Sequence, residues 1–299
     1  MPRGKIAVFG VPTAAGATRA GTERAPFALR EVGLLQSLRD LGSPVVNLSD
    51  LSLFPYRDDA GASARNKDVV ACAARAAADE MPRALAEGFT VVLGGDCSLV
   101  VGTLAGARQA LGQPVGLVYL DANADLNTPE TSPSGVLSGM ALSLALGRGP
   151  EEVVAAGGAP PAVRPEHVAL IGFRELDPGE RRPLGDLGLA LPAAAARRLG
   201  MRTAAALALD GVGNEDGPIL VHLDVDVVDP LEMPAKGRIT EGLALSLAEV
   251  SDLVTAFLAS PRVIGIEVME YDPSGDPDGA HARKIVDLLC RAVARRLRA

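Results

Sequence analysis

Aromatic residues and cysteines are scarce in this sequence of 299 residues. It contains no tryptophan, three tyrosines, six phenylalanines and three cysteines, and aromatic residues make up 3% of the chain. With so few large rings, the core must be built from alanine, leucine, valine and glycine, which favours close packing of helices on a sheet. Three cysteines cannot form a framework of disulfides, so we expect the protein to work in a reducing compartment.

Positive charge and long apolar runs are also lacking. The formal net charge is −8 and the isoelectric point is near 5.0, and no basic stripe is interleaved with aromatic residues. This balance argues against nucleic acid or an anionic membrane as a partner. The segment MPRGKIAVFGVP has one short apolar run followed by turn residues, which is typical of a first strand and not of a signal peptide or membrane span. We therefore expect a cytoplasmic protein.

Short apolar runs rich in β-branched residues alternate with longer segments rich in alanine and leucine. We expect strands at 5–10, 89–95, 115–122, 167–173, 218–227 and 263–270. Helical patterns fall at about 24–40, 65–87, 99–111, 138–147, 193–208, 246–259 and 279–298. Continuously apolar strands separated by helices predict a doubly wound, mostly parallel sheet with helices on both faces. No repeat or linker divides the chain, and 148–165 has the composition of a surface loop, so we expect a single α/β domain over residues 1–299.

Polar residues gather where the expected strands end. In doubly wound sheets, ligands bind at the carboxyl ends of the strands. Five of these ends carry polar side chains: Asp96 and Cys97; Asp121, Asn123 and Asp125; Arg174 and Asp177; Asp224, Asp226 and Asp229; and Glu267 and Glu270. This convergence predicts a functional site along that edge of the sheet.

The spacing of these acids is that of a metal site. In VHLDVDVVDP, an extended strand would present His222, Asp224 and Asp226 on one face. The acids of DANAD have the same spacing, provided that the chain stays extended beyond Leu120. Gathering four aspartates without a cation would cause strong repulsion or proton uptake, and oxygen-rich ligand sets suit Mg²⁺ or Mn²⁺. The alternative is that each acid separately caps a helix or loop.

Seven sequence blocks then follow one another in a specific order and spacing. They read GVPTAAGATRAGTERAPFALREVGLL, GGDCS, DANADLNTP, SPSGVLSGM, FRELDPGE, DVDVVDP and GIEVMEYDP. Over nearly the whole chain they resemble the arginase/agmatinase (ureohydrolase) family. This resemblance implies a three-layer α/β fold, one or two Mn²⁺ ions, a small guanidino substrate, and a homo-oligomer that is a trimer or hexamer.

The resemblance also assigns the positions of the metal ligands. One ion would be held by Cys97, Asp121, Asp125 and Asp224, and the other by Asp121, Asn123, Asp224 and Asp226. The family has histidines at the positions of Cys97 and Asn123, and arginases have another, often assigned to proton transfer, at the position of Ser138. All three functional histidines are therefore replaced in this sequence.

These replacements leave metal binding chemically feasible. The thiolate of Cys97 would be a softer ligand, favoured by a neighbouring cation and by a position just before a helix. The side-chain oxygen of Asn123 can coordinate a hard ion as a neutral ligand. Two alternatives stay open. Cys97 could be a small buried apolar residue, and His222 could be either a ligand or a hydrogen-bond partner of a liganding aspartate.

The substrate side matches the arginase pattern. In arginases, the positions of Asn127 and Ser134 contact the α-carboxylate of an amino acid. The position of Asp177 reaches the α-amino group, and that of Glu270 pairs with the guanidinium. These residue types suit those groups, and Asn127 and Ser134 favour an amino acid over agmatine, which lacks the carboxylate. Both residues also favour turns and could serve only there.

The resulting hypothesis is a metal-dependent hydrolase of a guanidino amino acid, of the arginine or N-hydroxyarginine type, that releases urea or a urea-like product. Asp125 would accept a proton from the attacking water, and Glu270 would hold the guanidinium in line. Without a histidine at Ser138, protonation of the leaving amine would slow by roughly 10²–10⁴-fold. N-hydroxyarginine has a better leaving group and would suffer less.

Two rival hypotheses remain. The chain could be a catalytically weak or inactive arginase-family homologue that acts as a binding or partner protein. Alternatively, Cys97 could be a covalent nucleophile that attacks the guanidinium carbon, with His222 as its base.

Overall fold

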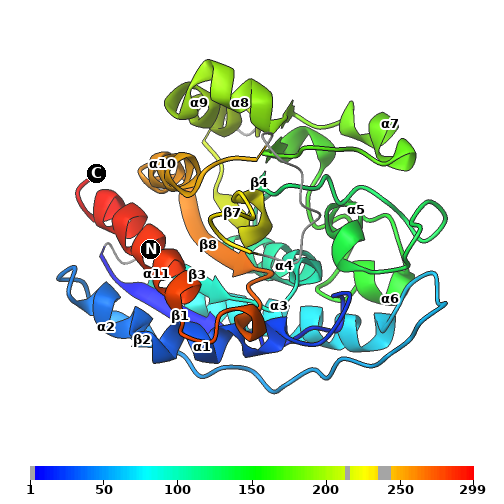
Figure 1. Cartoon of the computed structure of the whole chain (residues 1–299), viewed down its shortest axis with the longest axis horizontal. Helices are drawn as coiled ribbons and strands as arrows, with labels where there is room; N and C mark the ends of the chain where they lie inside the picture. Colours follow the sequence, from blue (N-terminus) through cyan, green and yellow to red (C-terminus); the bar gives the residue numbers. More distant parts are fainter. Residues whose placement is uncertain (1–3, 213–215, 235–243) are drawn as a thin grey trace.

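The fold is built on one sheet of parallel strands (Figure 1). The structure is a computed structural model that describes residues 4–212, 216–234 and 244–299. Its eight described strands are β1 (Ile6–Gly10), β2 (Val45–Asn47), β3 (Phe89–Leu93), β4 (Gly116–Leu120), β5 (Val168–Ile171), β6 (Leu189–Leu191), β7 (Ile219–Asp224) and β8 (Val263–Met269). They lie in the order β2-β1-β3-β8-β7-β4-β5-β6, and every described pair is parallel.

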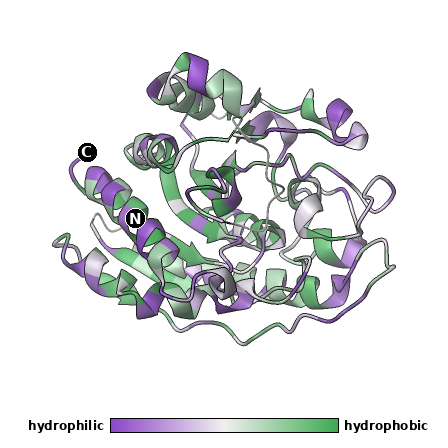
Figure 2. Ribbon diagram, in the orientation of Figure 1, coloured by the Kyte–Doolittle hydropathy of each residue, from purple (hydrophilic) through white to green (hydrophobic). Residues whose placement is uncertain are grey.

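Helices cover both faces of the sheet, which confirms the doubly wound α/β prediction. One apolar core lies under α1 (Ala25–Glu31), α2 (Leu34–Arg39), α8 (Ala193–Leu199), α9 (Met201–Gly211), α10 (Leu247–Leu258) and α11 (Ala280–Leu297). The other lies under α3 (Lys67–Glu87), α4 (Val100–Leu111), α5 (Ala141–Ala145) and α6 (Glu151–Val154). In β1, Ile6 and Val8 point to the first core, whereas Ala7 and Phe9 point to the second. Figure 2 shows the apolar strands between these helices, whose outer faces are hydrophilic.

The six expected strands are all present, but the sequence pattern missed two short ones. β2 and β6 have three residues each and lie at the two edges of the sheet. The expected strand 218–227 ends at Asp224, because Val225–Val227 form a 3₁₀ turn. The sheet is therefore fully parallel over its described strands, and its site-bearing strands end earlier than their apolar runs predict.

Glycines break two of the expected helices. The pattern over 24–40 forms α1 and α2, separated by Gly33 with a φ of 95°. The pattern over 193–208 divides into α8 and α9 at Gly200, where φ is 81°. Side chains other than glycine rarely adopt such angles, so the helix must stop there.

Two loop expectations also need correction. The segment 148–165, expected to be a loop, contains the four-residue helix α6. The chain does not stay extended after Leu120, because it bends at Ala122 and Asn123, and Asp125 has a φ of 52°. None of the described helices is long and apolar enough to cross a membrane.

Candidate active site

A pocket of about 360 Å³ lies beyond the carboxyl ends of the central strands. Every residue that the sequence assigned to metal or substrate lines it, with the exception of Asp121. These lining residues are Cys97, Asn123, Asp125, Asn127, Ser134, Asp177, Asp224, Asp226 and Glu270. The pocket is of a size that suits a small metabolite. The structure thus brings together side chains that are up to 173 positions apart, as in the pair Cys97 and Glu270.

The aspartates at the strand ends also shape the backbone there. The carboxylate of Asp224 accepts a 2.7 Å hydrogen bond from the backbone N–H of Asp226, and that of Asp121 accepts a 2.6 Å bond from the N–H of Asn123. Such bonds hold the chain in a tight turn directly after the strand. Asp121 and Asp224 thus hold turns, as the capping alternative expected, but they also face one another and do not act separately.

Three of the acids form one buried group. Asp121, Asp224 and Asp226 offer oxygen atoms that all lie within 4.8 Å of one another. Burial, together with repulsion from the neighbouring carboxylates, raises the pKa of Asp121 and Asp224 well above the ordinary range. The Oδ2 atom of Asp121 is buried without a hydrogen-bond partner among the described residues. A divalent cation would satisfy that atom and remove the repulsion, so the residues present fit a metal.

Asp125 lies at the side of this group in a constrained conformation. Its φ of 52° is uncommon for a residue other than glycine. Its Oδ2 accepts a 2.6 Å hydrogen bond from the hydroxyl of Tyr119. Burial raises the pKa of Asp125 to about 8, although the bond from Tyr119 acts in the opposite direction. Tyr119 lies within the apolar run of β4, and in the sequence only its position two residues before Asp121 indicates that it belongs to the site.

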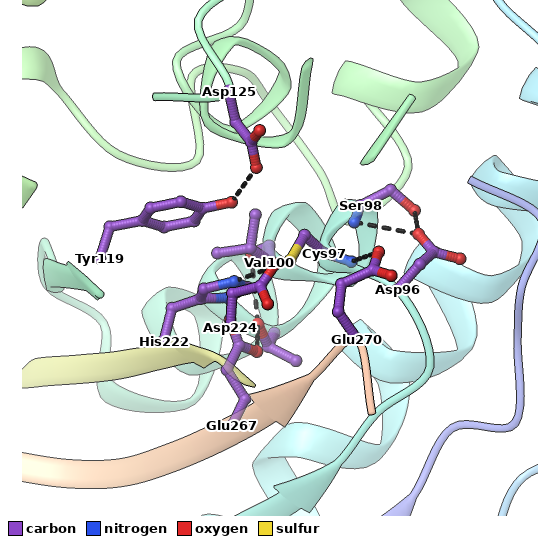
Figure 3. A network of polar contacts seen from close by, with 11 residues as sticks. Asp96, Cys97, Ser98, Val100, Tyr119, Asp125, His222, Asp224, Glu267 and Glu270 are labelled. Carbon is purple, nitrogen blue, oxygen red and sulfur yellow. Dashed lines mark hydrogen bonds and ion pairs between the residues drawn. The ribbon is translucent and has the colours of Figure 1, made fainter. Parts of the chain in front are cut away.

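Cys97 lies in the middle of the acids (Figure 3). Its Sγ is 3.1 Å from Oδ2 of Asp224 and 3.2 Å from Nε2 of His222. Its backbone N–H donates a 3.4 Å hydrogen bond to Oε1 of Glu270. Only 1% of Cys97 is exposed, and burial together with the surrounding acids raises the pKa of the thiol well above its usual value. Cys97 is therefore buried in the core and is also part of the polar cluster.

His222 belongs to a row of side chains on three adjacent strands. The strand register pairs it with Tyr119 on β4 and with Glu267 on β8. Its ring stacks on that of Tyr119, with centroids 4.2 Å apart and planes 7° apart. Its Nδ1 lies 2.6 Å from Oε1 of Glu267, whose Oε2 accepts a 2.6 Å bond from the hydroxyl of Thr103. Its partners are thus Glu267 and Cys97, and the expected bond to an aspartate is not seen among the described contacts.

Asn123 and Arg174 both contact Asp226. The side-chain nitrogen of Asn123 donates a 3.0 Å bond to Oδ2 of Asp226, so its amide nitrogen and not its oxygen faces this acid. Asn123 is otherwise exposed. Nη2 of Arg174 donates to the backbone carbonyls of Asp226 at 2.7 Å and of Val228 at 3.2 Å. Its positive charge opposes the effect of burial, which raises the pKa of Asp226.

The expected substrate residues lie around the pocket. Nδ2 of Asn127 donates a 2.9 Å hydrogen bond to Oδ2 of Asp177. Asp177 in turn forms a capping box with Glu180, a residue that the sequence reading missed. Ser134 and Ser138 line the same pocket.

Glu270 has a φ of 63°, and its backbone N–H donates a 2.8 Å bond to the carbonyl of Gly95. Two of the pocket acids, Asp125 and Glu270, thus have backbone conformations that are typical of functional sites.

Comparisons with known proteins find arginases. The family model described as "Arginase family" matches residues 4–294. The arginase of Bacillus subtilis is 33% identical over 295 residues, which cover 98% of either chain. The arginase of Bacillus caldovelox is 33% identical over 290 residues, covering 95% of this chain and 96% of its own. The crystal structure of arginase from Bacillus cereus superposes with a TM-score of 0.86 at 31% identity, covering 96% of this chain and 98% of that one.

These matches define the class of protein. The chain belongs to the arginase family of ureohydrolases, and it is similar to bacterial arginases. The resemblance seen in the sequence blocks is therefore confirmed, with Cys97 among the residues that could hold a metal.

Proposed function

We propose that this chain is a metal-dependent hydrolase of a guanidino amino acid, of the arginine or N-hydroxyarginine type, that releases urea or a urea-like product. The observation that carries this proposal is the distribution of charge in the pocket. Asp177 with its partner Asn127, and Glu270, which accepts a hydrogen bond from Cys97 beside the buried aspartates, line the same pocket. A guanidino amino acid has a complementary charge at each end, namely an α-amino and α-carboxylate pair and a guanidinium.

A divalent cation would be held by Asp121, Asp125, Asp224 and Asp226, with Cys97 and Asn123 beside them. Mn²⁺, one or two ions, is the cation expected from the family. Such a cation supplies positive charge that activates water and polarises the guanidinium carbon. The Oδ2 of Asp121 has no hydrogen-bond partner in the part of the chain that the structure describes, which supports this assignment.

The chain's own residues would do the remaining work. Asp125 accepts the proton that the attacking water releases, and Tyr119 holds its carboxylate in place through their 2.6 Å hydrogen bond. Glu270 pairs with the guanidinium and fixes its direction. Asn127 and Ser134 donate to the α-carboxylate, and Asp177 accepts from the α-amino group.

The position of Ser138 bears on the substrate. Its hydroxyl lines the pocket at the position where the family resemblance expects a histidine. A serine is a far weaker acid than an imidazolium, so protonation of a poor leaving group is slow. N-hydroxyarginine has the better leaving group, and we expect it to be hydrolysed faster than arginine.

The test is urea or hydroxyurea release by the Mn²⁺-loaded protein from arginine, N-hydroxyarginine and agmatine. We expect N-hydroxyarginine to be the best of the three and agmatine the poorest. Asn127→Asp should raise KM for the two amino acids by roughly 10–100-fold, because it places a like charge against their carboxylate. Thr128→Ala, on the neighbouring exposed turn, is the matched control and should leave KM unchanged.

Two results would count against the proposal. Equal turnover of arginine and N-hydroxyarginine would remove the argument from Ser138. Binding of a guanidino amino acid without any release of product, in protein that holds its metal, would favour the alternative of a weak or inactive homologue that acts as a binding or partner protein.

A further inference from the structure

We propose that Cys97, His222 and Asp121 form a sulfur–nitrogen–oxygen site that binds Zn²⁺ or Co²⁺ more tightly than Mn²⁺. His222 would then provide the imidazole ligand from β7, a position that the family resemblance does not use. The proposal rests on the proposed function only in that both place a cation among these acids. It concerns which metal the site selects, and its test requires no turnover.

The ligand atoms are already close together. One atom each from Cys97, Asp121 and His222 lies within 4.8 Å of the others, and all three side chains are buried. Bond lengths of about 2.3 Å for Zn–S and 2.0–2.1 Å for Zn–N put the two donor atoms of a tetrahedral site roughly 3.6 Å apart. The Sγ of Cys97 and Nε2 of His222 are 3.2 Å apart. The pair needs to open by only a few tenths of an ångström to accept an ion.

The ring of His222 is held in the orientation and tautomer that a metal ligand needs. Glu267 lies 2.6 Å from Nδ1 and accepts its proton, so the lone pair is on Nε2 and points at Cys97 (Figure 3). Thr103 fixes Glu267 with a further 2.6 Å bond, and Tyr119 stacks on the ring. A carboxylate that orients a histidine in this way is the usual outer partner of a metal-bound imidazole.

Asp121 provides the independent sign of a ligand. It is fully buried, and its Oδ2 has no hydrogen-bond partner among the described residues. A buried carboxylate oxygen without a partner is costly, and a cation between it and Cys97 would remove that cost.

The donor types then decide the metal. Thiolate and imidazole are softer ligands than carboxylate and suit Zn²⁺ or Co²⁺, whereas Mn²⁺ prefers oxygen. The group formed by Asp121, Asp224 and Asp226 offers only oxygen. Such a group also follows the general order of affinity, in which Mn²⁺ is the weakest, but softer ligands widen the difference. Sulfur from Cys97 and nitrogen from His222 beside the oxygen of Asp121 should therefore increase the selectivity against Mn²⁺ without removing metal binding.

Cys97 and His222 could instead act as a nucleophile and its base. The surroundings disfavour that reading, because Cys97 is 1% exposed and faces Asp224 at 3.1 Å. Negative charges at this distance suppress the thiolate unless a cation is present. A nucleophilic Cys97 is accordingly an outcome that the test must detect.

The experiment is a Co²⁺ titration of the full-length protein after chelator treatment, under reducing conditions. We expect one equivalent of Co²⁺ to produce a sulfur-to-cobalt charge-transfer band and intense visible bands of a four-coordinate ion. Cys97→Ser should abolish the charge-transfer band, while the matched control Cys72→Ser, at an exposed cysteine, should retain it. His222→Asn should weaken Co²⁺ binding by roughly 10–100-fold. Zn²⁺ should displace the Co²⁺ at equal concentration, whereas Mn²⁺ should need a large excess.

A second measurement needs no variant and guards against misfolding of His222→Asn. Zinc X-ray absorption of the wild-type protein should show one sulfur at about 2.3 Å together with an imidazole. A zinc shell without sulfur, a band that survives Cys97→Ser, or Mn²⁺ that competes equally with Zn²⁺ would each overturn the proposal. So would a covalent substrate adduct on Cys97. If oxygen atoms alone bind the metal and urea is still released, the present proposal fails and the proposed function stands. If the sulfur-to-cobalt band is seen but no substrate is hydrolysed, only the proposed function fails.

Discussion

The hydroxyl of Tyr119, in β4, donates a 2.6 Å hydrogen bond to Oδ2 of Asp125, which follows the carboxyl end of this strand (Figure 3). Both side chains are buried, and the backbone of Asp125 has a φ of 52°. Because the tyrosine comes from a regular strand, it provides a rigid support for an acid that lies on a turn. The ring of Tyr119 also stacks on His222, so one residue supports two parts of the site.

Tyr119→Phe should therefore affect both stability and the pH dependence of activity. The ring remains, but a buried carboxylate loses a donor, which costs about 1–3 kcal/mol in the free energy of unfolding. The bond from Tyr119 lowers the pKa of Asp125. Its loss should move the acidic limb of the kcat/KM profile to higher pH and reduce kcat. Urea denaturation and a pH–rate profile measure the two effects.

A second buried tyrosine supplies the control. The hydroxyl of Tyr271 donates a 2.7 Å hydrogen bond to Oδ2 of Asp276, which lies outside the pocket. Tyr271→Phe should lower the free energy of unfolding by a similar amount and leave the pH profile of kcat/KM unchanged. If both variants shift the profile equally, Tyr119 has only a structural role.

Much of this site could be predicted from the sequence, because it consists of polar residues at the ends of apolar runs. Asp121 and Asp224 are recognisable in this way without a structure. The row formed by Tyr119, His222 and Glu267 is not, because it depends on the register of three strands. Those strands are neighbours in the sheet although their order along the chain is β4, β7, β8, and only tertiary packing decides which strands adjoin.

The edges of the sheet were missed for a related reason. β2 and β6 have three residues each, too few to show a periodic pattern. They are held by pairing with β1 and β5, not by their own composition. The close contact of Gly102 in α4 with Ala74 in α3 is a helix–helix contact, which the expectation of helices packed on a sheet did not include.

Arg174 should control metal affinity without touching the metal. Its guanidinium holds the carbonyls of Asp226 and Val228 and thereby fixes the turn that carries the Asp226 carboxylate. Arg174→Lys keeps the charge but cannot span both carbonyls. We expect metal affinity, measured by calorimetry, to fall by roughly 10–100-fold. Arg174→Met should lose more, because it also removes the charge that opposes the raised pKa of Asp226.

Arg262 is the matched control for Arg174. It donates to the carbonyls of Gly217 at 3.1 Å and Leu209 at 2.9 Å, at the opposite end of β7. Arg262→Lys should reduce stability to a similar degree and leave metal affinity unchanged. A loss of affinity in this variant would mean that the effect at Arg174 reflects general destabilisation.

Removal of metal should make stability depend on pH. In the chelated protein, the pKa of Asp125 is about 8 and that of Asp121 is raised, whereas unfolded aspartates titrate near pH ~3.9. Between about pH 4 and pH 8, the unfolded chain has released protons that the folded chain retains, so the free energy of unfolding falls as pH rises. We expect the Tm of chelated protein to fall from pH 5 to pH 8, and added metal to raise Tm more at pH 8.

Asp125→Asn serves as the control for this titration. It removes one of the ionisable groups, so the Tm of the chelated variant should fall less steeply over the same pH range. If Tm changes with pH in the same way in chelated and metal-loaded protein, the buried acids do not govern stability.

The contact between α3 and α4 should tolerate no added methyl group. A Cβ at Gly102 would overlap the carbonyl oxygen of Ala74, which belongs to the backbone of α3 and cannot rotate away. Alanine is the better helix former by about 1 kcal/mol, but overpacking against a rigid neighbour costs about 1–3 kcal/mol and occasionally more. We therefore expect Gly102→Ala to lower the free energy of unfolding. Gly275→Ala meets no atom within 4 Å and should change it by less than about 0.5 kcal/mol. Since α4 follows Cys97 directly, a shift of this helix should also weaken Co²⁺ binding in Gly102→Ala and not in Gly275→Ala.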